Sequence, residues 1–336
     1  MECRVKVFKG CCLDGGRLRL AFYWAASCGG CEIAVLDINE KILEVVQTAD
    51  IVFWPAAIDV KYGDVEKMPD KYIDVCFFNG GIRNSEQDRM ARLLREKSKI
   101  LIAYGSCACF GGIPGLANLY SGREILEKIY IKTPSTVNPE NIIPKPVVHV
   151  REGELELPVL YDEVKALNQN VEVDYYIPGC PPAVERTVFA LEAILKGELP
   201  PKGSVLAPQK SVCDECPKVK ENKKISHICR VYEKIPSPEK CLLEQGIICM
   251  GPATRGGCGA RCLNVDMPCT GCGGPCPNVS DQGAAMLSAL ASIISAEEKR
   301  SLNEIRRIIN SIADPAGTFY MYVLPSSTLK RRFVRE

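Results

Sequence analysis

The sequence predicts an α/β protein, in which a mostly parallel sheet with helices on both faces is followed by a mostly irregular, cysteine-rich region. Two observations support this prediction. Strand-like and helix-like segments alternate along the first part of the chain, a pattern typical of a parallel sheet covered on both faces. Residues 213–276 then hold ten of the nineteen cysteines and eight glycines, with little apolar periodicity.

Short apolar runs of strand length alternate with amphipathic segments in the predicted sheet region. The expected strands are 18–26, 50–55, 73–80, 99–105 and 171–179. The expected helices are 31–46, 85–97 and 182–197. Ser85 is the expected N-cap of the second helix, and the third helix is opened by a proline and closed by a glycine. The proline-rich, charged stretch 131–165 is expected to cross the surface.

The cysteine-rich region is expected to need bound metal for its stability. Residues 213–276 have little apolar periodicity and cannot bury enough hydrocarbon to fold by themselves, so bound metal is expected to supply their core. A helix is expected at 280–295. The expected domains are an N-terminal extension (1–17), a sheet domain (18–203) and a C-terminal domain (204–336).

Composition and charge exclude several classes of function. The formal net charge is +1, which gives no electrostatic basis for binding nucleic acid or an anionic membrane surface. The sequence has no apolar run of about 18 residues or more, so no membrane span is expected. Neither an apolar signal segment nor a twin-arginine pair is visible near Met1. We therefore expect a cytoplasmic protein.

Nineteen cysteines are the unusual feature of the composition. In a reducing compartment, so many thiols indicate metal binding rather than disulfides. The chain has only two histidines, His149 and His227, and no CxxCH motif, which excludes c-type haem. Two histidines cannot serve several Cys/His zinc sites, and no Cys-x-His pair exists for a Rieske centre. The remaining possibility is all-cysteine ligation, of either zinc or iron–sulfur clusters.

Four cysteines follow the ends of three predicted strands. The first strand leads to the Cys28-x-x-Cys31 pair, a middle strand leads to Cys107, and a late strand leads to Cys180. Parallel strands place these loops at one edge of the sheet, where ligands bind in open α/β sheets. Four converging thiolates, on turns of small residues, fit a cubane cluster. Cys76, in the middle of a strand, is interpreted as an ordinary core residue.

The motifs around these cysteines resemble those of the [NiFe]-hydrogenase small subunit. They are CxxC after the first strand, GSCA after a middle strand and PGCPP after a late strand. The resemblance covers about residues 18–290 and implies a flavodoxin-like, doubly wound domain. It also implies a proximal [4Fe-4S] cluster on Cys28, Cys31, Cys107 and Cys180. The variants GSCACFGGIPGLAN and PSTVNPE are similar to those of cytoplasmic methyl-viologen-reducing, deazaflavin-non-reducing hydrogenases.

The resemblance assigns the remaining cysteines to two further [4Fe-4S] clusters. In the family, a GPxT motif marks the switch from distal to medial ligands, and CMGPATRGGC supplies it here. The implied distal ligands are Cys213, Cys216, Cys241 and Cys249. The implied medial ligands are Cys258, Cys262, Cys269 and Cys272. Periplasmic relatives have a histidine where Cys213 stands and a proline near position 262, so this chain departs from them with all-thiolate, four-iron clusters.

Two similar motifs of other proteins do not fit. A complex I subunit shares PGCPP but has adjacent cysteines in place of CxxC, and the adjacent pair here, Cys11 and Cys12, precedes the first strand. The segment DMPCTGC is similar to a nickel motif of hydrogenase large subunits. That motif needs a second cysteine pair from the far end of the chain, whereas the nearest pair here lies only a few residues upstream.

Some assignments stay open. Cys229 and Cys276 compete with the named medial and distal ligands. No role is expected for Cys3, Cys11, Cys12 and Cys109. Zinc ribbons are an alternative for the C-terminal region because their paired-cysteine spacing is similar. Glu32, directly after the CxxC pair, is either a hydrogen-bonding or proton-passing group near a cluster, or an acid favoured by the helix dipole.

The sequence therefore predicts an electron-transfer subunit with three [4Fe-4S] clusters and no catalytic residue of its own. No acid–base dyad, nucleophile triad, P-loop or GxGxxG motif is present. The resemblance implies a large subunit that holds nickel and oxidises H₂. It also implies a small [2Fe-2S] delta-type subunit and heterodisulfide reductase as further partners. The alternatives are an iron–sulfur subunit of a nickel-free redox complex and a zinc-stabilised interaction scaffold.

Overall fold

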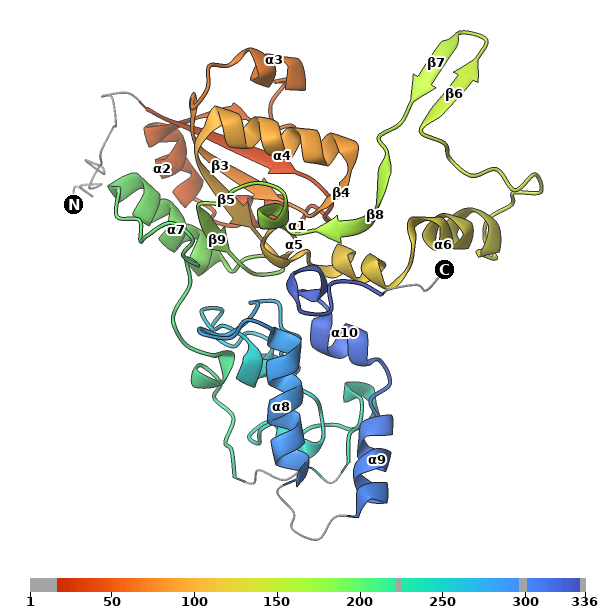
Figure 1. Cartoon of the computed structure of the whole chain (residues 1–336). Coiled ribbons are helices and arrows are strands. Elements are labelled where there is room, and N and C mark those ends of the chain that lie inside the picture. Colours follow the sequence, from red (N-terminus) through yellow and green to blue (C-terminus); the bar gives the residue numbers. More distant parts are fainter. Residues whose placement is uncertain (1–16, 222–224, 226, 296–300, 333–336) are drawn as a thin grey trace, which may run out of the picture.

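The architecture is a parallel sheet with helices on both faces, joined to a C-terminal region of loops and helices (Figure 1). The computed structural model describes residues 17–221, 225, 227–295 and 301–332. The five-stranded sheet has the order β2-β1-β3-β5-β9, and every pair is parallel. Its strands are β1 (Leu18–Trp24), β2 (Ala49–Phe53), β3 (Ile73–Asn79), β5 (Ser98–Tyr104) and β9 (Tyr175–Ile177). This is the strand order of a flavodoxin-like sheet, which confirms the predicted fold class.

Helices cover both faces of the sheet, as the alternation predicts. The helices on one face are α1 (Gly30–Leu36), α2 (Lys41–Thr48) and α7 (Val184–Lys196). The helices on the other face are α3 (Tyr62–Lys67), α4 (Ser85–Lys97) and α5 (Ser106–Phe110). Phe22 stacks on Phe77 on the first face, and Tyr23 lies against Phe78 on the second. Neighbouring residues of one strand point to opposite faces, so strands buried on both sides appear as continuous apolar runs.

Several element boundaries differ from the sequence prediction. The expected helix 31–46 is two helices, because the chain turns at Asn39, whose φ of 54° lies in the left-handed region. The N-cap of α4 is Asn84 and not Ser85, since the Asn84 side chain accepts from the Gln87 N–H at 2.9 Å. The end of α7 at Gly197, with a φ of 69°, is confirmed.

The stretch 131–165 crosses the surface, as predicted, and includes a projecting hairpin. Its two strands are antiparallel, and every residue in them is exposed. The following strand returns to the body and pairs with β4 (Ile82–Asn84). Figure 1 shows the hairpin pointing away from the sheet. The strands of this stretch are β6 (Val147–Val150), β7 (Gly153–Glu156) and β8 (Leu160–Lys165), and the helix that precedes it is α6 (Gly122–Glu127).

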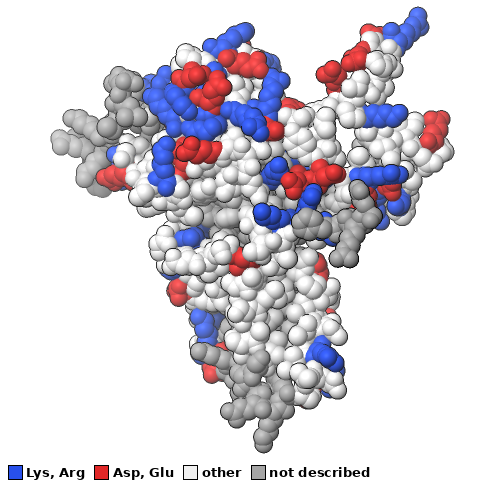
Figure 2. All heavy atoms as spheres, viewed as in Figure 1, with Lys and Arg blue, Asp and Glu red and all other residues white. Residues whose placement is uncertain are grey.

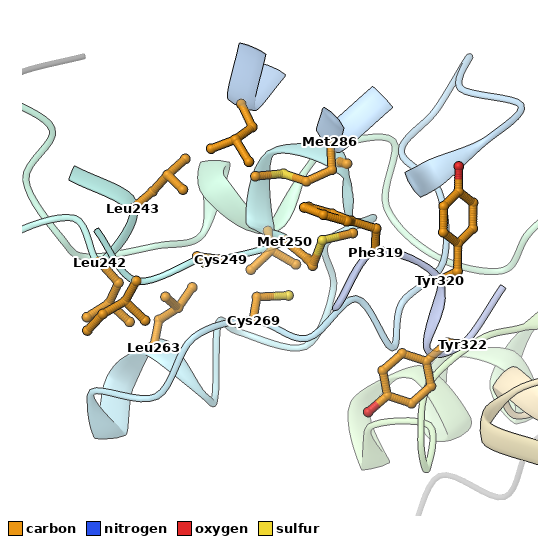
Figure 3. Close-up of a cluster of buried hydrophobic side chains, with 14 of the residues drawn as sticks. Leu242, Leu243, Cys249, Met250, Leu263, Cys269, Met286, Phe319, Tyr320 and Tyr322 are labelled. Atoms are coloured by element: carbon orange, nitrogen blue, oxygen red, sulfur yellow. The ribbon is translucent and has the colours of Figure 1, made fainter. Parts of the chain in front are cut away.

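The C-terminal region has little regular structure around its cysteines but has a hydrophobic core. In the described residues between α7 and α8, the chain forms short 3₁₀ turns and isolated bridges. Leu242 and Leu263 from these loops pack in one cluster with Met286 and Phe319 from the helices (Figure 3). The helices are α8 (Gln282–Ser295), α9 (Leu302–Asn310) and α10 (Pro315–Tyr320). The helix expected at 280–295 is confirmed as α8.

Segment 213–276 contributes to a hydrophobic core that it shares with the helices that follow it. Its apolar side chains are scattered singly along irregular loops and therefore show no periodicity, but they gather against the helices that follow. Cys249 and Cys269 lie in the same cluster (Figure 3). Any bound metal therefore adds to a hydrophobic core in this region rather than replacing one.

Charged side chains are unevenly spread over the face seen in Figure 2. Both signs gather over the sheet region, whereas the C-terminal region below it shows few charges in this view. The two signs are intermixed, in keeping with the formal net charge of +1. Among the described helices, none is both long and apolar enough to cross a bilayer.

Candidate metal-cluster sites

The first group of cysteines lies at the carboxyl edge of the sheet. Cys28 and Cys31 follow β1, Cys107 lies in α5 directly after β5, and Cys180 follows β9. β2 lies on one side of β1 and β3 lies on the other, so the strand order reverses beside β1. Ligands of open α/β sheets bind at such a switch point. These four cysteines are called the proximal set below.

The thiols of the proximal set lie close enough to affect one another's ionisation. Burial raises the pKa of the Cys31 thiol, and the thiolates of Cys107 and Cys180 raise it further. Burial likewise raises the pKa of Cys107 to about 12, with Cys180 and Cys28 adding to the shift. Thiolates held this close repel one another, and a cationic metal centre removes that repulsion. The donor set therefore fits a thiolate-bound cluster.

Two glycines make room for these sulfurs. Gly105, directly after β5, has a φ of 85°, and a Cβ there would overlap the Cys31 sulfur. Gly112 has a φ of 58°, and a Cβ there would lie 2.5 Å from the Cys107 sulfur. Any other residue at either position would meet both backbone strain and a steric clash. The glycines of GSCACFGG therefore allow the thiols to pack against the turns.

Glu32 is buried at the start of α1 and fastens the CxxC loop to the sheet. Its carboxylate accepts hydrogen bonds from the Trp54 indole N–H and from the Asn79 side-chain amide. Ser27 in turn donates to Asn79 at 2.9 Å. Burial raises the pKa of Glu32, and the two hydrogen bonds that it accepts oppose this shift. The partners lie on the sheet side, so the structure gives Glu32 a positioning role.

A second group of four cysteines, called the distal set, lies in the loops of the C-terminal region. It consists of Cys213, Cys216, Cys241 and Cys249. Burial raises the pKa of Cys213 to about 12; Lys220 opposes the shift, and the thiolates of the other three cysteines add to it. A Cβ on Gly251 would lie 3.1 Å from the Cys213 sulfur and 3.5 Å from the Cys249 sulfur. The structure thus brings these four thiols together beside the GPAT turn.

A third group, called the medial set, consists of Cys258, Cys262, Cys269 and Cys272. Burial raises the pKa of Cys272, the N–H of Cys180 opposes this shift, and the thiolates of Cys258 and Cys262 add to it. Burial also raises the pKa of Cys269, with further contributions from Cys249 and Cys272. Cys269 therefore lies between the rest of the medial set and the distal set.

The three sets follow one another in space. The Cys272 thiolate of the medial set lies close enough to Cys180, in the proximal set, to raise the pKa of the Cys180 thiol. Cys269 and Cys249 lie side by side in the C-terminal core (Figure 3). The N–H of Met250 donates to the Cys269 carbonyl at 2.8 Å and holds the distal and medial loops together. The order in space is therefore proximal, medial, distal.

The other described cysteines have different surroundings. Cys76 is buried in β3, as expected, and Cys109 is buried in α5, where its thiol donates to the Ala103 carbonyl at 3.2 Å. Cys229 forms a backbone bridge with Ile247. The Cys276 thiol donates to the Pro252 carbonyl at 3.4 Å. Cys3, Cys11 and Cys12 lie outside the described residues.

The thiols are not arranged around single ions. Within the described part of the chain, no three Cys, His, Asp or Glu side chains are placed as ligands of one metal ion. A structural zinc ion needs four ligand atoms around one centre. A [4Fe-4S] cluster instead takes one thiolate at each of four irons, so its ligands surround the cluster without meeting at a point.

Two polar residues, neither of which was predicted as a site residue from the sequence, form hydrogen bonds between the loops of the proximal and medial sets. The Ser106 hydroxyl donates to the Cys272 carbonyl at 2.5 Å and accepts from the Gly179 N–H at 3.2 Å. Arg186, in the first turn of α7, donates to carbonyls on both sides of the junction. The serine of GSCA, next to a cysteine, is a signal that could have identified Ser106. Arg186 has no local signal, because its partners in the medial loop lie about 70 residues away in the sequence.

Comparisons with known proteins place the chain in a family. The profile of the "NADH ubiquinone oxidoreductase, 20 Kd subunit" family matches residues 28–194. The iron–sulfur subunit of the F420-non-reducing hydrogenase of Archaeoglobus profundus is 42% identical over 95% of this chain and 99% of its own length. The corresponding F420-non-reducing hydrogenase subunit of Methanothermobacter thermautotrophicus is 37% identical over 95% of this chain and 98% of its own.

A solved NAD⁺-reducing [NiFe]-hydrogenase includes a chain that is 28% identical, with a TM-score of 0.47 over 55% of this chain and 94% of that chain. The two sequence relatives match nearly from end to end and are hydrogenase subunits. The chain therefore belongs to the family of these F420-non-reducing hydrogenase subunits.

Proposed function

We propose that this chain is the electron-transfer subunit of a [NiFe] hydrogenase and holds three [4Fe-4S] clusters in series. The proximal, medial and distal sets each hold one cluster through four thiolates. The observation that supports this most is the spatial order of the sets, with Cys180 close to Cys272 and Cys269 beside Cys249. Such an order lets single electrons move between neighbouring sites. When bound, the clusters supply this one-electron chemistry.

The residues of this chain hold the clusters, exclude water and set their electrostatic surroundings. Cys31, Cys107, Cys249 and Cys269 are buried, so water is kept from much of each site. Cys213 supplies a thiolate where some relatives have an imidazole, and Cys262 supplies a fourth medial thiolate. Added negative charge lowers the reduction potential of a cluster. Three low-potential clusters suit transfer to a low-potential acceptor.

The proposed partner at the proximal end is a large subunit that holds nickel and splits H₂. At the distal end we propose a [2Fe-2S] delta-type subunit and heterodisulfide reductase as acceptor, in the cytoplasm. The hydrogenase names of the relatives support the first partner. We also propose domain limits at 18–203 and 204–336, supported by separate hydrophobic clusters in the two parts, with Leu206 as the one buried residue, among those that the structure describes, that packs across this limit.

Metal analysis of the anaerobically purified protein tests this function. Three cubanes require about twelve irons and about twelve sulfides per chain. The complex with its partner should also contain nickel and reduce viologen with H₂. Iron and sulfide without nickel or H₂ activity would indicate a nickel-free redox complex. Stoichiometric zinc in place of iron would indicate a structural scaffold, and about eight irons would refute the third cluster.

A further inference from the structure

Arg186 is a buried cation at the junction between the proximal and medial sets. The residue is only 4% exposed. One guanidinium nitrogen donates to the Pro178 carbonyl at 2.7 Å, in the loop that carries Cys180. Another nitrogen donates to the carbonyls of residues 255 and 256, in the loop that carries Cys258. The guanidinium therefore lies between a loop of the proximal set and a loop of the medial set.

The hydrogen bonds of Arg186 satisfy its donors only in part and leave its charge uncompensated. In the part of the chain that the structure describes, its partners are carbonyls and no carboxylate pairs with it, while its Nε is buried without an acceptor. Glu215 is the neighbouring acid, but its oxygens accept from the N–H groups of Gly257 at 2.6 Å and Gly259 at 3.0 Å. A buried charge without a counter-charge is strongly destabilising.

Thiolates act on the Arg186 guanidinium more strongly than the neighbouring carboxylate does. Burial lowers the pKa of Arg186, and the thiolates of Cys258 and Cys272 oppose this shift more than Glu215 does. Both cysteines belong to the medial set. A guanidinium stays charged under nearly all conditions, so it is a permanent positive charge beside this set.

We propose that Arg186 compensates the negative charge of the medial cluster and thereby raises its reduction potential. The inference rests on the proposed function. A cluster with four thiolates is anionic and becomes more so when it gains an electron. A fixed cation in a site of low dielectric constant stabilises the reduced form more than the oxidised form. Arg186 therefore keeps the all-thiolate medial cluster reducible by its proximal neighbour.

An EPR-monitored redox titration of the anaerobically purified complex tests this role. Arg186→Gln removes the charge and keeps a polar side chain. At a fixed solution potential, the ratio of reduced to oxidised medial cluster should fall about tenfold, which corresponds to about 59 mV for one electron. The matched control is Arg261→Gln, next to Cys262. Arg261 is half-exposed and already paired with Glu185 at 2.7 Å, so its loss should leave the medial potential nearly unchanged.

If the Arg186→Gln protein fails to assemble its clusters, the Arg186→Lys protein still tests the proposal. Lysine keeps the charge but loses the planar fork, so it should restore the iron content and most of the medial potential. An unchanged potential in Arg186→Gln, or a Lys variant that loses the medial cluster as completely as Gln, would overturn the proposal. These outcomes leave the wild-type iron content untouched, so they are distinct from a failure of the three-cluster function itself.

Discussion

The proximal cysteines and the other two sets are held by different kinds of scaffold. The proximal set lies at the ends of hydrogen-bonded parallel strands, and the loop that carries Cys28 and Cys31 is fastened to the sheet through Glu32. The medial and distal sets lie on loops with short turns, which pack against α8 and α10. Sites built on regular elements are positioned more rigidly than sites built on loops. The sheet should therefore preform its site, whereas the loops should depend on both their core and their metal.

Removal of iron should cause the largest difference in local stability between the two regions. Chelation under reducing conditions should leave amides of β3 protected, while the Met250 N–H, which bonds to the Cys269 carbonyl, should exchange about a hundredfold faster or more. That factor corresponds to about 2.8 kcal/mol of local stability. Hydrogen exchange with mass spectrometry measures both sites in one experiment. Equal loss of protection in both regions would contradict the proposed difference.

Replacing one proximal cysteine should have the next largest effect. Cys107→Ser should remove about four of the irons and abolish H₂-dependent viologen reduction, because serine is a poor ligand for soft metals. Cys109→Ser is the matched control, two residues away. Its thiol bonds to the Ala103 carbonyl, which a hydroxyl can also do, so iron content and activity should stay near wild type. Similar results for both variants would refute the proximal assignment.

A change in the medial set should be smaller and specific. Cys262→Pro should convert the medial cluster to a [3Fe-4S] centre, with the loss of about one iron and a new EPR signal in the oxidised protein. Proline is compatible with the backbone at this position, where φ is −63°. Cys276→Ser serves as the control. If that variant gives the new signal and Cys262→Pro does not, Cys276 is the medial ligand.

The smallest expected effect concerns the turn beside the distal set. Gly251→Ala places a methyl group 3.1 Å from the Cys213 sulfur, so the thiol must move slightly. We expect full iron content, an altered distal EPR spectrum and a loss of about 1 kcal/mol in the free energy of unfolding. Gly63→Ala, in α3, meets nothing within 4 Å and should be neutral or slightly stabilising. An unaltered distal spectrum would place the distal cluster elsewhere.

The same contrast explains what could be predicted from the sequence. The shared edge of Cys28, Cys107 and Cys180 follows from strand periodicity, because parallel strands have one carboxyl edge. The grouping of Cys213 with Cys249, or of Cys258 with Cys272, has no periodicity behind it and depended on the family resemblance. For the medial and distal cysteines, motifs alone predict the grouping, because irregular loops give no geometric rule.

Other features could not be predicted because they depend on distant parts of the chain. The core of the C-terminal region forms only when Leu242 and Leu263 meet Phe319, which lies on a helix far along the sequence. Asn39 turns the chain between α1 and α2 through its left-handed backbone conformation, although the apolar spacing continues past it. Arg186 bonds to carbonyls about 70 residues away, and no local pattern encodes that contact.

The closeness of Cys180 and Cys272 has a consequence for the speed of the proposed relay. The Cys272 thiolate raises the pKa of the Cys180 thiol, and the Ser106 hydroxyl, beside Cys107, donates to the Cys272 carbonyl. Tunnelling through packed protein is faster than tunnelling across an empty gap of the same length. In the proposed relay, an electron would therefore pass from the proximal to the medial cluster through packed protein.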